Sequence, residues 1–572
     1  MGLTFSALYQ RLKSIRTRRY CAFTLGARGG FCDKWRTVKR FLLILLSLAF
    51  LATGARAAQF FTTAQEVTNV IAQAVTRAKQ LGGGNPFIAV VDREGYVLGV
   101  WSVTGAGNSS LTDFLGPVPL AIAKAGTAAF LSSDQHAFST RTAGFIVQQH
   151  FPPGVDNQPP GPLVGVNFSN LAFSDINRFK DLAGYNPALT NGTNGTSITT
   201  PLTGGLAGIS GGLPLYKNGK LIGGVGVAFE GEDPRDITPA SVNAPHRAED
   251  VALAAQSGYA PAAGIFGSRV TVGGIRFAYV ENSVPPPGAV LALTAGTNGN
   301  ALPAFPLTNS VAIAFPPITI GGVLGELRAP IIADPAVTPL AGAVANRLTA
   351  AEVTGILTAA ANRARTTRAG IRLPRGVPMQ CFISVVSNPG IFGGTNGGAP
   401  VVLGTICTSP DTTRFSWDVS VQKARTALFF SGATRAFSSR TVGFMAQQFY
   451  PPGIINTAPG IFLGMQERFS IVTPPTAITT NNPLNGAVFS TSTSLNANLP
   501  NGITIFPGGF PLYRNGVLIG AIGVSGDGID QDDIVAATGA ALFPPPEGIR
   551  ADKEFYRGAR LPYAKFPRNP AL

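Results

Sequence analysis

Two lysines and two arginines are the charged side chains that this sequence repeats at a fixed spacing. Lys124 and Arg141 lie 17 residues apart, and Lys423 and Arg440 recur at the same separation. Each of the four could bind an anionic group through charge-assisted hydrogen bonds. The alternative for each is a structural role, in which the long side chain lies along apolar surface or caps a backbone carbonyl.

These cations belong to a segment that the chain contains twice. Residues 124–154 and 423–453 align without gaps and share 18 of 31 positions, which indicates an internal duplication. Each copy predicts a helix, a break and a second helix. The break is expected near Ser132 and Asp134 in the first copy and near Ser431 and Gly432 in the second. Ser139 and Ser439 are predicted N-caps of the second helix, because a hydroxyl can accept from free backbone N–H groups there. A Pro-Pro pair is expected to stop it.

The residues that would support catalysis do not form a recognisable set. The sequence shows no Ser/His/Asp set, no Cys-x-x-Cys pair, no His-Glu-x-x-His helix and no repeated carboxylate dyad. Glu249, Asp250, Asp532 and Asp533 are interpreted as charges that favour the starts of two helices, rather than as a catalytic pair. The sequence therefore favours a protein without catalytic activity.

The net charge of +15 is concentrated at the N-terminus. Residues 1–57 hold 11 of the 44 basic residues and one of the 29 acidic residues, which leaves 33 against 28 in the rest. No basic run with interleaved aromatic residues occurs there, so nucleic-acid binding is not expected.

The N-terminal 57 residues resemble a leader with a signal peptide. Residues 41–52 form a short apolar run after Lys39 and Arg40, and an Ala-Arg-Ala site ends at Ala57. The run is too short for a permanent membrane span. We expect a periplasmic or secreted bacterial protein that is cleaved near Ala57.

Two cysteines remain after such cleavage. Cys381 and Cys407 lie at the outer ends of two consecutive predicted strands that fold back on each other. In an oxidising compartment this arrangement predicts a structural disulfide. A metal or haem thiolate is the alternative.

The remaining elements also occur twice. Capping boxes open predicted helices at 63–81 and 349–364, and strand pairs follow at 87–103 and 382–408. Hairpins at 211–227 and 508–524 match at 12 of 17 positions and turn at Asn-Gly, and closing helices are expected at 247–256 and 531–538. Passages rich in Gly, Asn, Thr and Pro, 183–208 and 477–502, are expected on the surface.

These elements predict an α+β fold of two homologous layered domains, each with an antiparallel sheet of about five strands flanked by helices. The predicted domains are 58–282 and 347–572. A linker rich in Pro, Gly and Ala, 283–346, separates them, and 311–320 could add a strand.

The repeated motifs resemble the GlcG/HbpS family of haem-binding or haem-degrading proteins. The resemblance rests on Thr-x-x-Glu-Val, Lys-Ala-x-Thr-Ala, the Gly-Gly-x-Pro-Leu-Tyr-x-Asn-Gly hairpin and the Asp-Gln-Asp-Asp helix start at 530–533. It covers both halves. It implies a profilin-like fold, similar to PduO C-terminal domains, and assembly through dimers, so that the tandem chain forms an intramolecular pseudo-dimer or a homo-oligomer.

The resemblance implies a haem cofactor and a small hydrophobic anionic ligand site. Haem needs an apolar slot, cations for its propionates and usually an axial ligand. The expected cofactor-binding residues are Lys124, Phe138, Arg141, Phe145 and His150 in the first copy, and Lys423, Phe437, Arg440 and Phe444 in the second.

His150 is the expected iron ligand. No histidine is repeated between the copies, since His136 aligns with Arg435 and His150 with Phe449. The two copies therefore cannot ligate iron alike. The Glu-x-x-Glu pattern of extracellular relatives is also missing from this chain.

The function predicted from the sequence is that of an exported haem- or tetrapyrrole-binding protein in haem or iron sensing or handling. Two alternatives remain open. One is a non-catalytic sensing or binding module for another small molecule or a protein partner, because folds of this type host many ligands. The other is an enzyme of oxidative or glycolate-related metabolism.

Overall fold

The computed structural model describes residues 62–565, apart from residues 83, 105–115, 149, 157, 165–206, 234–235, 286–287, 311–314, 336–346, 391–399 and 464–502. The predicted leader lies outside the described residues, as do almost all of the two passages rich in Gly, Asn, Thr and Pro. Residues 59–572 form one compact unit that contains both copies.

The helix that opens each copy is fixed by a capping box, as predicted. The hydroxyl of Thr63 accepts from the Glu66 backbone N–H at 3.2 Å, and the Glu66 carboxylate accepts from the Thr63 N–H at 2.8 Å. Thr349 and Glu352 make the same two bonds at 3.2 and 2.9 Å. Each box satisfies backbone donors that the first helical turn would leave unpaired.

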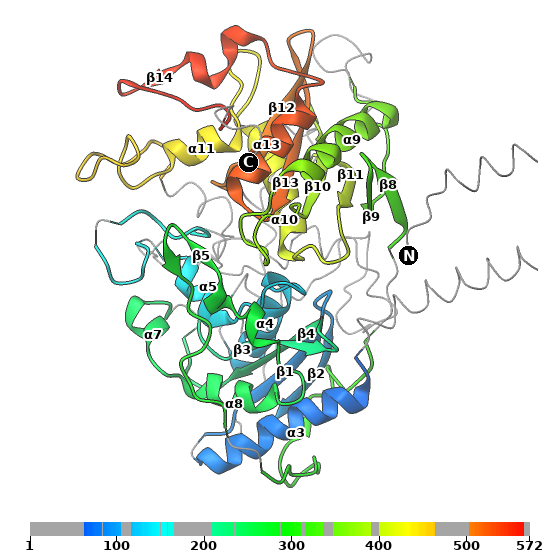
Figure 1. Cartoon of the computed structure of the whole chain (residues 1–572), viewed down its shortest axis with the longest axis vertical. Helices are drawn as coiled ribbons and strands as arrows, with labels where there is room; N and C mark the ends of the chain where they lie inside the picture. Colours follow the sequence, from blue (N-terminus) through cyan, green and yellow to red (C-terminus); the bar gives the residue numbers. More distant parts are fainter. Residues whose placement is uncertain are drawn as a thin grey trace, which may run out of the picture. The chain divides into compact units, whose positions relative to one another are not determined.

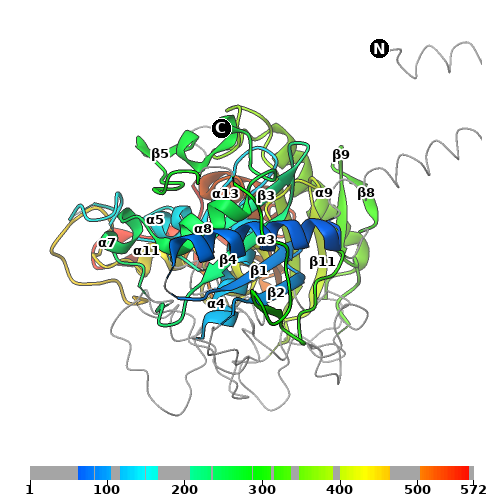
Figure 2. The ribbon, with the colours of Figure 1, turned by 90° about the horizontal axis from the view of Figure 1, so that it is seen from below.

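The first copy is a layered α+β structure. Its elements are α3 (Ala64–Leu81), β1 (Phe87–Asp92), β2 (Val97–Ser102), α4 (Pro117–Leu131), α5 (Thr140–Ile146), β3 (Gly212–Lys217), β4 (Lys220–Ala228), α7 (Pro239–Asn243), α8 (Arg247–Ala255), β5 (Thr271–Val272), β6 (Ile275–Arg276) and β7 (Asn300–Ala301). The antiparallel sheet has the order β3-β4-β1-β2-β7. Alternate residues of β1 enter different cores, Ile88 and Val90 on the side of α3 and α8, and Phe87 and Ala89 on the side of α4. Figure 2 shows α3 and α8 lying together across one face of this sheet.

The second copy repeats this arrangement (Figure 1). Its elements are β8 (Pro317–Ile320), β9 (Val323–Ala329), α9 (Ala350–Thr366), β10 (Cys381–Ser387), β11 (Val402–Cys407), α10 (Phe415–Phe429), α11 (Ser439–Met445), β12 (Gly509–Arg514), β13 (Val517–Gly526), α13 (Ile529–Ala540), β14 (Phe555–Tyr556) and β15 (Ala559–Arg560). The sheet order is β12-β13-β10-β11-β9-β8. Helices α9 and α13 pack on one face of it and α10 on the other. The predicted α+β class with antiparallel sheets and flanking helices is confirmed.

The two Asn-Gly hairpins turn as predicted. Asn218 and Gly219 have φ values of 52° and 72°, and Asn515 and Gly516 have 49° and 80°. Positive φ at both central residues matches the twist of the flanking strands. The turns therefore fix the register of β3 against β4 and of β12 against β13.

The helix-break-helix unit is present in both copies, but one predicted cap was wrong by one residue. Ser139 caps α5, as expected, with its hydroxyl accepting from the Thr142 N–H at 3.0 Å. In the second copy the cap is Ser438, which aligns with Ser139, and its hydroxyl accepts from the Thr441 N–H at 3.2 Å. Ser439 is the first residue of α11, and its hydroxyl accepts from the Gly509 N–H at 2.8 Å instead.

The predicted linker supplies edge strands to both sheets. Within 283–346, β7 pairs with β2 of the first sheet, and β9 pairs with β11 of the second. The expected extra strand at 311–320 is present in part as β8, which pairs with β9. This segment therefore completes both sheets at the edge farthest from the Asn-Gly hairpins.

The predicted disulfide between Cys381 and Cys407 is not present, because the strand register forbids it. Cys407 lies opposite Phe382, one residue beyond Cys381. Successive residues of a strand point to opposite faces, and the two cysteines accordingly enter different cores. Both thiols are free and buried, and Cys407 Sγ lies 3.3 Å from the Ser409 carbonyl oxygen.

We therefore expect both thiols to be free and protected in the folded protein. Alkylation without a reductant should leave Cys381 and Cys407 unmodified in buffer and should label both in denaturant, as read by peptide mass spectrometry. A peptide pair joined through these two cysteines would contradict the observed register.

Candidate functional site

The repeated lysine of the first copy is part of the protein interior. Lys124 is fully buried on α4, and its Nζ donates to the Val227 carbonyl at 2.8 Å and to the Glu232 carboxylate. Burial lowers the pKa of Lys124, and the attraction of Glu232 opposes this shift. The ammonium therefore joins α4 to the end of β4.

The matching lysine has the same role with a carboxylate from another position. Lys423 Nζ donates to the Val524 carbonyl at 2.8 Å and to Asp532 at 2.7 Å. Burial raises the pKa of Asp532 to about 7, although Lys423 acts to lower it. Asp532 stands where the first copy has Ala248, since the two Cβ atoms approach the equivalent glycines Gly508 and Gly211. The lysine was therefore retained while its acidic partner changed position.

The repeated arginines are also held by acids of the closing helices. Arg141 is fully buried and forms two bonds to Glu249, at 2.8 and 3.0 Å, in addition to two bonds to backbone carbonyls. Arg440 bonds Asp533 and Asp530, both at 2.9 Å. The helix-start acids therefore neutralise these arginines.

None of the four predicted cations is free for a ligand in this structure. Removing one partner of a buried ion pair costs about 3 to 5 kcal/mol, because the other charge stays buried. Binding a propionate at these positions would require giving up such a pair. In this structure Lys124, Arg141, Lys423 and Arg440 therefore have structural roles, which was the alternative to anion binding.

The phenylalanines of the first copy lie in a closed cluster. Phe138 and Phe145 are 3% and 8% exposed, and they pack with Phe151 and Phe277 at ring-centroid distances between 5.4 and 6.1 Å. The same cluster contains residues of the second copy, including Phe415 of α10. The second copy therefore covers the aromatic residues of the first.

The equivalent cluster of the second copy is more open. Phe437 is buried at 4% exposure, whereas Phe430, Phe444, Phe462 and Tyr556 are half-buried. The rings of Phe430 and Phe462 lie 4.8 Å apart, and those of Phe444 and Tyr450 lie 5.5 Å apart. All members of this cluster among the described residues come from the second copy. We call these side chains the second-copy aromatic cluster.

One arginine beside this cluster lacks a carboxylate partner among the residues described. Arg435 is exposed, and its guanidinium lies 5.8 Å from the centre of the Phe437 ring. Arg435 aligns with His136, so it is not among the residues that the two copies share and was not predicted as a ligand residue. Its proximity to Phe437, only two residues away, was the available signal.

The three histidines have different surroundings. His136 is buried, with Nδ1 2.9 Å from the Ser133 hydroxyl and Nε2 3.2 Å from the Leu131 carbonyl, and burial lowers its pKa to about 3. His246 caps α8 through Nδ1. His150 is half-buried, and its Nδ1 lies 3.0 Å from the Gln158 carbonyl. A proton on Nδ1 would leave the Nε2 lone pair of His150 available for a metal.

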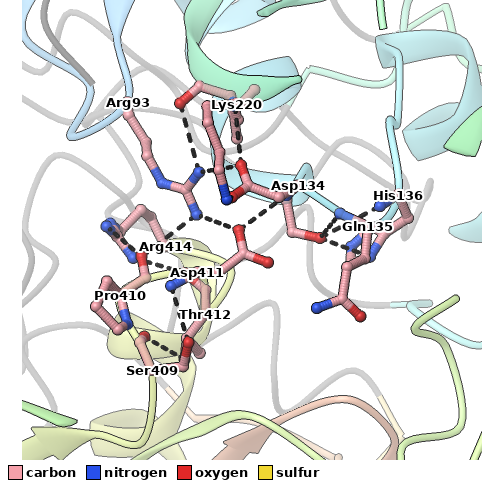
Figure 3. A network of polar contacts seen from close by, with 12 residues as sticks. Arg93, Asp134, Gln135, His136, Lys220, Ser409, Pro410, Asp411, Thr412 and Arg414 are labelled. Atoms are coloured by element: carbon pink, nitrogen blue, oxygen red, sulfur yellow. Dashed lines mark hydrogen bonds and ion pairs between the residues drawn. The ribbon is translucent and has the colours of Figure 1, made fainter. Parts of the chain in front are cut away.

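A network of buried charges joins the two copies (Figure 3). The Asp411 carboxylate accepts from Arg93 of the first copy at 2.9 Å, from Arg372 at 2.7 Å and from the Asp134 backbone N–H at 2.8 Å. Arg372 also donates to Asp527 at 2.6 Å. Burial raises the pKa of Asp411, but Arg93 and Arg372 outweigh this effect and hold it at about 2.

A second group of charges continues the same contact. Glu94 of the first copy accepts from Arg414 at 2.7 Å and from Arg328 at 3.1 Å. The Arg328 guanidinium lies 3.7 Å from the centre of the Phe315 ring, where it is shielded from water. Arg414 and Arg93 also donate to the same backbone carbonyl, that of Pro410.

The network residues were not found from the sequence because they are not repeated. Arg93 aligns with Asn388, and Asp134 aligns with Ala433. An alignment of the two copies identifies the residues that they share, whereas the contact between the copies is made by residues in which they differ. Only 13% of the residues in this chain are charged. A charged side chain that occurs in just one copy was therefore the sequence feature that could have indicated the contact.

The described part of the chain contains neither a cluster of potential metal ligands nor a candidate membrane-spanning helix. No group of three or more His, Cys, Asp or Glu side chains there could hold a metal ion. No helix within those residues is both long and apolar enough to cross a bilayer.

Comparison with known proteins places a family match in the second copy. Residues 396–541 match the family model described as "Haem degrading protein HbpS-like". No curated protein matches the chain. Two solved structures are similar to about a third of it. A PduOC–heme complex has 20% identity and a TM-score of 0.21, and covers 34% of this chain and 94% of its own. Klebsiella pneumoniae protein ORFY, of family DUF336, has 19% identity and a TM-score of 0.19, and covers 34% of this chain and 89% of its own.

The charge network generates a stability prediction. Asp411→Asn should lower the free energy of unfolding at pH 7 by about 3 kcal/mol, because two buried arginines lose their shared anion. Chemical denaturation followed by circular dichroism measures this. Asp552→Asn, which breaks a more exposed pair with Arg550, is the control and should cost less than about 1 kcal/mol.

The same variant should alter the response to acid. The folded pKa of Asp411, about 2, lies below its ordinary value, so its contribution to stability is present above about pH 4 and is lost as the pH falls towards 2. The difference between wild type and Asp411→Asn should narrow over that interval. Equal stability of the two proteins at pH 7 would show that the network does not hold the copies together.

Proposed function

We propose that this chain is an exported protein that binds haem or a related tetrapyrrole, with the second-copy aromatic cluster as the main site. The observation that carries the proposal is the coincidence of two features. The stretch that matches the HbpS-like family model, 396–541, contains Phe430, Phe437, Phe444, Tyr450 and Phe462, and the rings of Phe430, Phe444 and Phe462 are half-buried. Export is proposed from the leader-like sequence of residues 1–57 alone.

The chemistry of the cluster fits a flat, hydrophobic anion. Aromatic rings provide apolar surface and edge-to-face contacts for a macrocycle. Arg435, beside Phe437, provides a guanidinium that can bind a propionate with two hydrogen bonds. The half-buried rings could therefore contact the macrocycle while Arg435 holds its acidic edge.

Iron ligation differs between the copies under this proposal. The second copy has no histidine at the position of His150, where Phe449 stands. We propose His150, through the Nε2 that its Nδ1 contact leaves available, as the iron ligand of a separate haem at the first copy, distinct from the main site in the second. Bound haem would supply iron-centred chemistry, and the residues described here would hold and orient it.

A haemin titration tests the proposal. The purified full chain should bind haemin saturably, with a Soret band that reports binding. Arg435→Gln should weaken binding by about ten- to a hundredfold, because a charge-assisted propionate contact is worth about 1.5 to 3 kcal/mol. Arg375→Gln, at an exposed arginine in the loop before β10, is the matched control and should bind as wild type does.

His150 is tested separately with metal-free protoporphyrin IX. His150→Ala should change the Soret position of the haemin complex while leaving protoporphyrin binding unaltered, because only iron needs the imidazole. An unchanged spectrum would assign the ligand elsewhere. Weak, non-saturable absorption by the wild-type chain would refute haem binding and favour a sensing module for another ligand.

A further inference from the structure

The second copy exposes five large apolar side chains in two neighbouring segments of its surface. Four lie in the loop after α11, and the fifth is the first residue of β14. We call these five the apolar patch: Ile454, Ile455, Ile461, Leu463 and Phe555, which are 54%, 49%, 59%, 47% and 69% exposed.

The same positions are less apolar in the first copy, although the backbone is alike. The Phe462 N–H donates to the Met445 carbonyl at 3.0 Å, and the Leu163 N–H donates to the Ile146 carbonyl at 3.0 Å. The counterparts of the patch are, in the same order, Val155, Asp156, Pro162, Val164 and Thr271. The fold therefore does not require exposed Ile, Leu or Phe at these positions.

The two parts of the patch are held together. Arg557, in the turn after β14, donates to the Pro459 carbonyl at 2.9 Å. The Tyr450 hydroxyl donates to the Tyr556 carbonyl at 3.1 Å, and their rings lie 5.0 Å apart. In Figure 1, β14 and the loop after α11 extend towards the same side. The loop and the β14-β15 hairpin thus form one surface.

Basic residues accompany this surface. Phe555 lies opposite Arg560 in the register of β14 and β15, so the two side chains share a face of the hairpin. Arg557 and Arg560 are exposed and have no carboxylate partner among the described residues. Of the nearby acids, Asp552 is paired with Arg550 at 2.6 Å and Glu547 with Lys553 at 2.7 Å, while Glu554 is a further carboxylate next to Phe555. The surface is therefore apolar with a positive edge.

We propose that the apolar patch docks this protein onto an anionic lipid surface. Exposed Ile, Leu and Phe side chains can enter the boundary between headgroups and acyl chains, and arginines beside them bind lipid phosphates. A second copy of this chain is a poorer occupant. Two-fold contact would bring Arg557 and Arg560 of both chains into one interface, where two of the local acids, Asp552 and Glu547, are already paired.

Vesicle sedimentation tests the docking. The full chain should bind vesicles of phosphatidylglycerol and phosphatidylcholine in equal parts, and should bind pure phosphatidylcholine vesicles at least about tenfold less. The double variant Ile455→Asp and Phe555→Thr introduces the residues that the first copy has at the equivalent positions, Asp156 and Thr271. It should fold, because the first copy has the same backbone arrangement with these residues. It should reduce binding at least about tenfold. Arg560→Gln should weaken binding only to the anionic vesicles.

The matched control changes the two equivalent positions of the first copy. Asp156→Ala with Thr271→Ser should bind vesicles as wild type does. Absence of binding to anionic vesicles, or binding unaffected by Ile455→Asp and Phe555→Thr, overturns the proposal. If Ile455→Asp with Phe555→Thr instead abolishes concentration-dependent self-association in sedimentation velocity, the patch binds a second copy of this chain and the lipid proposal is wrong. Loss of haemin binding without any vesicle binding would assign the patch to the haem site.

Discussion

The shared carboxylate of Asp411 is the interaction on which the arrangement of the two copies depends. It lies between an arginine of each copy and also accepts a backbone N–H from the first, so three elements far apart in the chain meet at one buried anion. Such a charge is tolerated only when its partners are in place. The second copy can then lie over the aromatic residues of the first, where Phe415 enters their cluster.

The residues that the two copies share and those in which they differ have different structural roles. The shared lysines and arginines tie α4, α5, α10 and α11 to the sheets and closing helices within each copy. The contact between copies needs unlike surfaces, so Arg93 and Asp134 have no charged counterpart. As a result one aromatic cluster is closed and the other stays half-buried. The copy left open is the one that contains the HbpS-like match.

Local sequence patterns predicted the elements well. Capping boxes at Thr63 and Thr349 and the Asn-Gly turns were confirmed, because each depends on residues within a few positions of one another. Predictions that depended on the register of paired strands, or on the ionic partners of a charged side chain, failed more often. The proposed disulfide needed Cys381 and Cys407 on one face, and a shift of one residue placed them on opposite faces. The expected ligand cations have acidic partners from segments that follow far along the chain.

The sequence by itself predicted an α+β fold with antiparallel sheets and flanking helices, since helix caps, tight turns and alternating apolar residues act over short distances. It also determined the resemblance that motivates a haem ligand. Only the tertiary structure decided which charges are free and which aromatic cluster stays open. Those properties depend on side chains more than a hundred residues apart, such as Lys124 with Glu232 and Arg93 with Asp411. No local pattern records such pairs, because the energy of a buried charge depends on its partner in space.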